Sequence, residues 1–256
     1  MSARSRGNLF RISAIVGLSL FALNLALQAT ATTRQGINFV TESREIPLYI
    51  KSIDFLHRHY AYQRIAREVT AGQPSDQDRA LAVFAWTRRT IRPTPKGFPI
   101  VDNHVLDIII RGYGVADQMA DVFCTVSTYA GVPAFWEFSH GVHGSPGLVL
   151  SFAKIDGAWR VFDVAHGVVF ADAEGHLLPL ESLLEHPALL SSVTSQAPQH
   201  IPYAEYLEEL RPFTVPDTLR AEKQMPWPRL VFEIRQHFHS ALGTLLQEHS
   251  HHRTTL

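Results

Sequence analysis

The chain has 256 residues, of which 46% are hydrophobic and 18% are charged, and its formal net charge is −1 with histidines neutral. These values are typical of a globular protein with a sizeable core, and they exclude a disordered chain. Lys and Arg are scattered without a basic stripe, so no nucleic-acid partner is predicted. The single cysteine, Cys124, excludes an intrachain disulfide and a multi-cysteine zinc site.

Residues 1–31 have the pattern of a cleaved signal peptide or an N-terminal membrane anchor. Three arginines precede an uncharged, mostly apolar run over residues 12–27, and residues 29–31 fit a small-x-small cleavage site. The run is shorter than the roughly 20 residues that span a bilayer comfortably, so both alternatives stay open. In either case the positive-inside bias predicts an exported, extracytoplasmic location, such as the periplasm, for the rest of the chain.

Residues 32–74 are expected to form a lead-in, irregular over 32–45, and a first helix. Apolar residues at near-helical spacing predict that helix over 48–70, and an Ala-Gly-Gln-Pro segment ends it. Ser75 is the expected cap of a second helix, with Asp78 three residues further on in a capping-box-like position. Three prolines and a glycine predict a loop over 92–104.

Helices precede strands over residues 75–186, the predicted core. A third helix is expected over about 116–130, because Gly131 is placed to cap it and Pro133 prevents its continuation. A short helix is expected at 179–185, and strands at 134–139, 147–155, 158–165 and 167–171. Residues 187–256 are expected to be a mixed, proline-rich extension that ends in a helix over about 229–248. Helices followed by an antiparallel meander predict an α+β fold.

The dipeptide Asp156-Gly157 predicts a tight hairpin with Ile155 opposite Ala158. In that register one face of the sheet carries Leu148, Leu150, Phe152, Val161 and Asp163. Leu148 is then a diagonal neighbour of Asp163. A buried carboxylate on an apolar face needs a hydrogen-bond donor. We therefore expect Asp163 to be paired with a backbone amide or with one of His140, His143 and His166.

Residues 111–118 read Arg-Gly-Tyr-Gly-Val-Ala-Asp-Gln and lead directly into the third helix. A glycine-rich turn lets the backbone approach a substrate closely. A helix N-terminus lowers the pKa of a thiol placed there, which activates it as a nucleophile. No thiol occupies this turn, since Ala116 has no group that ionises or attacks.

This segment and residues 154–170 resemble the transglutaminase-like superfamily, a branch of the papain-like cysteine enzymes. The resemblance implies a core in which a central helix packs on an antiparallel sheet, with flanking helices. In bacterial members the first segment reads roughly Gly-Tyr-Gly-x-Cys-Asp-Gln, and its nucleophilic cysteine corresponds to Ala116. Counting back from the hairpin glycine puts the catalytic histidine at Leu148, and the orienting aspartate matches Asp163.

The resemblance therefore implies a triad in which the two members that carry out proton and bond chemistry are lost. We predict a catalytically degenerate protein of the cell envelope that uses the inherited cleft to bind a peptide-like or glycan ligand, or a protein partner. The alternative is an active cysteine protease, amidase or acyl transferase that uses Cys124 or a rearranged histidine. A third hypothesis is a structural subunit of an envelope assembly. No cofactor or metal is predicted, and membrane contact is expected only through an uncleaved N-terminal segment.

Further candidate residues lie in both motifs and in the loop before the second strand. Asp117 and Gln118 either contact a ligand or cap the helix. His143 either replaces the lost histidine or is a solvated loop residue. Cys124 lies just over two helical turns from Ala116 and is either a core residue or a displaced nucleophile. The candidate cleft residues are Gly112, Tyr113, Gly114, Asp117, Gln118, His140, His143 and Trp159.

Overall fold

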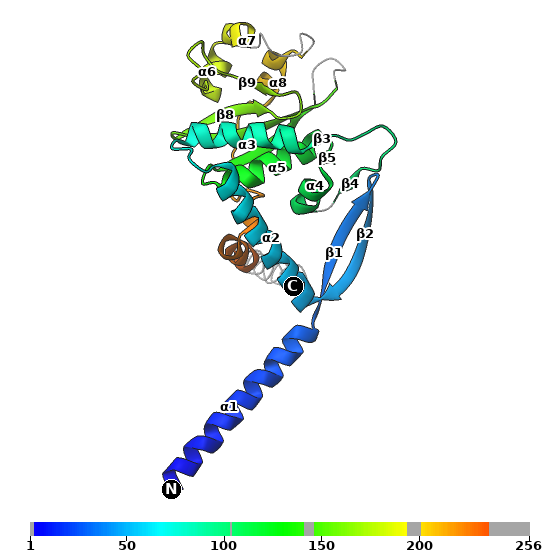
Figure 1. Cartoon of the computed structure of the whole chain (residues 1–256), viewed down its shortest axis with the longest axis vertical. Helices are drawn as coiled ribbons and strands as arrows, with labels where there is room; N and C mark the ends of the chain where they lie inside the picture. The colour runs from blue at the N-terminus through cyan, green and yellow to red at the C-terminus, as the bar shows by residue number, and fades with distance from the viewer. Residues whose placement is uncertain (1–2, 103, 141–145, 194–200, 236–256) are drawn as a thin grey trace, which may run out of the picture. The chain divides into compact units, whose positions relative to one another are not determined.

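The computed structural model describes residues 3–102, 104–140, 146–193 and 201–235. The chain divides into two compact units, Met1–His57 with Val101–Asn103, and Arg58–Ile100 with His104–Leu256. Figure 1 shows the helices and strands of both units. The fold is α+β, as the sequence predicts.

The first unit contains helix α1 (Ala3–Gln28), a β-hairpin and the beginning of α2 (Leu48–Val69). Strand β1 (Thr30–Ile37) pairs antiparallel with β2 (Val40–Pro47), and β4 (Val101–Asp102) pairs with the end of β1. The expectation of an irregular segment over 32–45 is wrong. This hairpin buries almost none of its side chains, so its sequence lacks the apolar alternation that indicates a strand.

Among the residues that the structure describes, no helix is both long and apolar enough to cross a bilayer.

The helices of the second unit follow the sequence signals closely. The first predicted helix is α2, and the second is α3 (Asp76–Thr90), where the Ser75 side chain accepts a hydrogen bond from the Asp78 amide at 3.0 Å. The third is α5 (Ala116–Tyr129), and Gly131 follows it with φ +86°. Helix α4 (Val105–Arg111) was not predicted, because its seven residues are too few for a helical period to show in the sequence.

The sheet of the second unit has four antiparallel strands in the order β6-β7-β8-β9. The pairs Ile155–Ala158 and Ser151–Phe162 confirm the register predicted from the Asp-Gly turn. A separate parallel pair joins β3 (Arg92–Pro93) to β5 (Tyr113–Gly114). The four strands are β6 (Ala134–Ser139), β7 (Leu148–Ile155), β8 (Ala158–Asp163) and β9 (Val168–Val169).

Helices cover both faces of this sheet, so the unit has two apolar layers (Figure 1). In one layer Ala153 and Phe162 pack with residues of α5 such as Phe123. In the other, Leu150 packs with side chains that follow the sheet in the chain, including Leu207. That second layer is formed by α6 (Leu180–Glu185), α7 (Ala188–Val193), α8 (Tyr203–Glu209) and the segment before the short helix η2 (Glu222–Gln224).

The short helix predicted at 179–185 is α6. The last helix is described over 226–235, so it begins earlier than predicted, and its predicted continuation to 248 lies outside the described residues. The predicted domain limits at residues 31, 74 and 186 stay predictions.

Candidate functional site

The turn that leads into α5 is built on two glycines. Gly112 ends α4 in the left-handed region with φ +73°, where a side chain would be strained. Gly114 is buried, and a Cβ added to it would lie 3.0 Å from Cβ of Gln118. The pairing of Tyr113 with Arg92 and of Gly114 with Pro93 holds this turn beside β3. The local backbone structure therefore explains why both positions of the motif are glycine.

Tyr113 lies half-buried between an arginine and a phenylalanine. The ring of Phe98 meets it edge-on at 5.5 Å between centroids, and the guanidinium of Arg111 lies 5.5 Å from its centroid. Such an arrangement combines edge-to-face and cation–π contacts. Phe98 keeps 54% of its surface exposed, so an aromatic platform faces solvent next to the start of α5.

The two polar residues in the first turn of α5 differ in their burial and in their contacts. Gln118 is buried, and its Oε1 accepts hydrogen bonds from Arg111 Nη2 at 2.6 Å and from the Val115 amide at 3.3 Å. Asp117 is exposed, and its Oδ1 accepts from the Gln118 amide at 2.8 Å. Of the two alternatives for Gln118, these contacts favour a structural role, whereas the exposed Asp117 caps the helix and remains accessible to a ligand.

Ala116 is the first residue of α5 and is half-buried, at the place where the resemblance puts the nucleophile. Its methyl group offers no thiolate for the helix N-terminus to stabilise. Leu148, at the place implied for the histidine, is the first residue of β7 and is only 5% exposed. It belongs to the apolar layer that includes residues of α6 and α8, whereas the apolar residues of α5 belong to the layer on the other face of the sheet.

Asp163 is fully buried and has hydrogen-bond partners at both oxygens. The His166 amide donates to Oδ1 at 2.9 Å, and His166 Nδ1 lies 2.8 Å from Oδ2. The hydroxyl of Tyr203 donates to Oδ2 at 2.7 Å. The expected pairing of a buried Asp163 with a nearby histidine and a backbone amide is confirmed.

Sequence analysis missed Tyr203, which lies 40 residues away in the chain. No signal in the proline-rich segment around it predicts a contact with the sheet. Burial, and then the neighbouring carboxylate of Asp163, raise the pKa of Tyr203 above its usual range. The tyrosine therefore keeps its proton and acts as a donor to the carboxylate.

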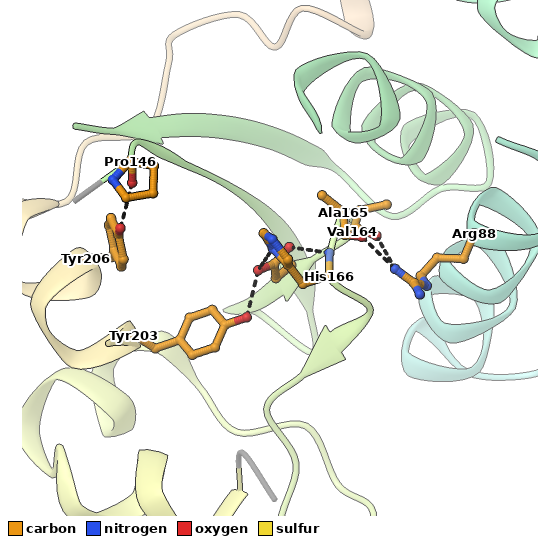
Figure 2. A network of polar contacts seen from close by, with 8 residues as sticks. Arg88, Pro146, Val164, Ala165, His166, Tyr203 and Tyr206 are labelled. Carbon is orange, nitrogen blue, oxygen red and sulfur yellow. Dashed lines mark hydrogen bonds and ion pairs between the residues drawn. The ribbon is translucent and has the colours of Figure 1, made fainter. Parts of the chain in front are cut away.

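Arg88 of α3 holds the turn that presents His166. Its Nη1 donates to the carbonyl oxygens of Val164 at 3.0 Å and Ala165 at 2.8 Å (Figure 2). Gly167 lets the guanidinium pack against the backbone, since an added Cβ would overlap the Arg88 side chain. The buried carboxylate and this arginine together determine the conformation of residues 163–167.

Cys124 lies in the middle of α5 and is only 4% exposed. Burial, and then the negative charge of Asp121, raise the pKa of its thiol well above the usual value. An activated thiolate needs the opposite environment, with access to solvent and a lowered pKa. These properties favour the core cysteine over the displaced nucleophile.

Three candidate cleft residues remain. His140 is exposed, its ring meets Phe138 edge-on at 5.1 Å, and its amide donates to Glu209 Oε1 at 3.3 Å. Trp159 is half-buried and meets the ring of Phe135 edge-on at 5.0 Å. His143 lies outside the described residues. Within the described ranges no three His, Cys, Asp or Glu side chains converge to hold a metal ion.

Comparisons with known proteins find a family match in the middle of the chain. A family model described as the transglutaminase-like superfamily matches residues 63–160. No curated protein sequence matches the chain.

Three solved structures are similar to it, and in each case the chain spans about half or less of the length of the solved protein. A candidate cysteine protease from Cytophaga hutchinsonii is 18% identical over 46% of this chain and 40% of that one, with a TM-score of 0.36. A candidate protease from Parabacteroides distasonis is 13% identical over 52% and 35%, with a TM-score of 0.32. A TGase is 13% identical over 64% and 51%, with a TM-score of 0.35.

Proposed function

Since the transglutaminase-like superfamily model matches residues 63–160, we propose that the chain is a catalytically degenerate member of that superfamily that binds a ligand without turning it over. The observation that carries this proposal is the environment of Leu148. Its side chain is packed into the apolar layer beneath α8, among residues such as Leu150 and Tyr206. At that position a side chain is shielded from solvent by apolar neighbours, and a substrate has no access to it, since packed interiors leave few voids.

The other two positions of the implied triad support the same proposal. Ala116 lacks a nucleophilic group, and the buried thiol of Cys124 keeps its proton. The carboxylate of Asp163 accepts hydrogen bonds from Tyr203 and His166, so it stabilises the packing of α8 and the turn after β8. A carboxylate used in this way explains why the aspartate is present although the nucleophile is not.

The surface around the start of α5 is the candidate binding site. Tyr113 and Phe98 offer an aromatic platform, and the exposed carboxylate of Asp117 lies next to it in the chain. Aromatic faces bind apolar side chains of peptides and the apolar faces of sugars. The arginine-led N-terminal segment supports an exported location, soluble or tethered, so the ligand we propose is a peptide-like or glycan component of the envelope, or a protein that displays one.

A turnover assay tests the loss of catalysis. The wild-type chain is incubated with short peptides for hydrolysis and with a glutamine peptide plus a primary amine for acyl transfer. We expect no product above the protein-free control, and the same result for Cys124→Ser. Turnover by the wild type that disappears in Cys124→Ser would establish the cysteine enzyme instead.

Alkylation by iodoacetamide tests the two thiol positions. In the folded wild type we expect Cys124 to stay unlabelled until denaturant is added. In Ala116→Cys we expect rapid labelling of one thiol, with an apparent pKa below about 8.5, because the helix N-terminus stabilises a thiolate. Labelling of Cys124 in the native wild type at neutral pH would contradict the proposal.

A binding screen tests the aromatic platform. Short peptides and glycan oligomers are screened against the chain by saturation-transfer NMR, and binders are measured again with Tyr113→Ala. We expect the affinity to fall about tenfold, because a stacking face is lost. Tyr60→Ala removes an exposed aromatic residue of α2 and serves as the control. Equal affinity for wild type and Tyr113→Ala would place the ligand elsewhere.

A further inference from the structure

The hairpin of the first unit has a strand edge that nothing in the described structure covers. Strand β2 lies at the end of the order β2-β1-β4, and Val40 to Glu45 are all exposed. On the other side, β4 adds only the two pairs Gly36–Asp102 and Ile37–Val101. A two-stranded ribbon with so little buried surface is marginally stable in water, and an open edge is a template for another strand.

The turn determines which backbone groups point to the open edge. With a two-residue turn, Ile37 and Val40 form a hydrogen-bonded pair. Hydrogen-bonded and non-hydrogen-bonded pairs then alternate, so residues 40, 42, 44 and 46 direct their backbone groups to β1. The groups of residues 41, 43 and 45 face outward and are available to a second strand.

The sequence of β2, Val-Thr-Glu-Ser-Arg-Glu-Ile-Pro, is complementary to itself in one antiparallel register. Centred on Ser43, that register pairs Glu42 with Arg44 of a second copy and Val40 with Ile46 of the second copy, each pair occurring twice. The charged pairs then fall at non-hydrogen-bonded positions, where Cα atoms are only about 4.5 Å apart. Centring the strands on Glu42, Arg44 or Glu45 would instead oppose like charges, which is destabilising.

The tip of the hairpin provides a second feature. Phe39 is 87% exposed and has φ +67°, an uncommon conformation for a bulky residue that calls for an explanation. In the register centred on Ser43, Phe39 lies opposite Pro47 of the second copy, next to the start of α2 there. An apolar pocket of about 470 Å³ lies at that end of the hairpin, lined by Ala26, Leu27, Leu48, Tyr49, Ser52 and Ile53.

From these observations we propose that the chain forms a two-fold homodimer in which the β2 edges of two copies pair antiparallel around Ser43. In the form of the chain that retains α1, each Phe39 enters the apolar pocket at the base of the partner's hairpin. The interface is isologous, so every contact occurs twice and the assembly closes at two copies. In the isolated chain Glu42 and Arg44 already form an ion pair of 3.0 Å along the strand, and dimerisation exchanges it for two pairs across the interface.

Light scattering coupled to size exclusion tests the assembly with the full chain. A mild non-ionic detergent is present throughout, so that the exposed apolar side chains of α1 do not drive association. We expect a protein mass of twice 28.7 kDa for the wild type. Glu42→Arg and Arg44→Glu should each weaken the dimer about tenfold, and the double variant should restore it. Glu45→Arg is the matched control, because its partner across the interface is Thr41.

Cysteine cross-linking tests the register directly. Ser43→Cys brings two thiols face to face with Cα atoms about 5.5 Å apart, within the range of a disulfide. In Thr41→Cys the two cysteines are offset by four residues along the paired strands, so their Cα atoms lie about 13 Å apart. We expect covalent dimers from Ser43→Cys alone, and from a mixture of Thr41→Cys and Glu45→Cys. A monomeric wild type, or cross-linking of Thr41→Cys to itself as efficient as that of Ser43→Cys, would overturn the proposal.

Phe39→Gly tests whether the Phe39 side chain anchors the dimer, without destabilising the hairpin turn itself. Asn-Gly is the preferred sequence for a type I′ turn, so the substitution relieves the strained backbone. We nevertheless expect at least a tenfold weaker dimer, because the apolar anchor is lost. An unchanged or tighter dimer would contradict the insertion of Phe39 into the pocket.

Discussion

Asp163, which the resemblance matches to an orienting aspartate, holds together the packing around it. Its carboxylate is fully buried, and its oxygens have donors from the His166 amide and Tyr203, with the His166 ring at hydrogen-bond distance. Burial of such a group is costly unless hydrogen bonds replace its water. The tyrosine that completes this set comes from α8, so the residue joins the sheet to the C-terminal part of the chain.

Two tyrosines of α8 allow this contribution to be measured. Tyr203→Phe removes a hydrogen bond to a buried carboxylate and should lower the free energy of unfolding by about 1.5–3 kcal/mol. Tyr206→Phe removes a hydrogen bond of 2.6 Å to the carbonyl oxygen of Pro146 and should cost about 1 kcal/mol. Urea unfolding of both variants at pH 7 makes the comparison. An equal cost for both would mean that Asp163 gains nothing from its charge.

Among the elements, the turn at the start of α5 contains the residues of the glycine-rich motif and the contacts that they make. The turn needs Gly112 for its left-handed conformation and Gly114 for its close approach to Gln118. Gln118 in turn joins Arg111 to the Val115 amide. These contacts give Gly112, Gly114 and Gln118 local structural roles that do not depend on a nucleophile.

Substitutions in this turn distinguish support from ligand contact. Gln118→Ala should lower the free energy of unfolding by about 1–3 kcal/mol, because it removes the buried acceptor that joins Arg111 to the Val115 amide. Asp117→Ala, at an exposed position in the same turn, should cost at most about 1 kcal/mol. Thermal and urea unfolding measure both. A neutral Gln118→Ala would show that the buried amide has no structural role.

For the whole second unit, the C-terminal segment is part of the core. Leu207 is 1% exposed and packs in the same apolar layer as Leu150 and Leu148. Side chains from α6 and α8 cover a sheet face that would otherwise expose a large apolar surface. The core and the C-terminal extension, separate in the sequence analysis, therefore share one hydrophobic layer.

Leu207→Ala tests this shared layer. We expect it to lower the free energy of unfolding by about 2–5 kcal/mol, as for a large-to-small change in a packed core. Glu205→Ala, on the exposed side of the same helix, should stay within about 0.5 kcal/mol of wild type. Tryptophan fluorescence reports the transition. A Leu207→Ala cost below about 1 kcal/mol would mean that α8 is not part of the folded core.

The sequence by itself determined the local features of this protein. The Asp156-Gly157 turn gave the correct sheet register, Ser75 gave the start of α3, and the glycine-rich segment predicted a turn leading into α5, with Ala116 at its first residue. These signals lie within a few residues of the structure they determine. The resemblance to the transglutaminase-like superfamily depends on the same kind of local pattern, so it too could be identified without coordinates.

Only the tertiary structure decided which face of the sheet is covered and by what. Tyr203 reaches Asp163 across 40 residues, and no local pattern encodes that contact. The hairpin of β1 and β2 was not predicted either. It buries so few side chains that its sequence shows no apolar alternation. The burial of Leu148 and Cys124 likewise follows from long-range packing, which depends on the whole chain closing around them.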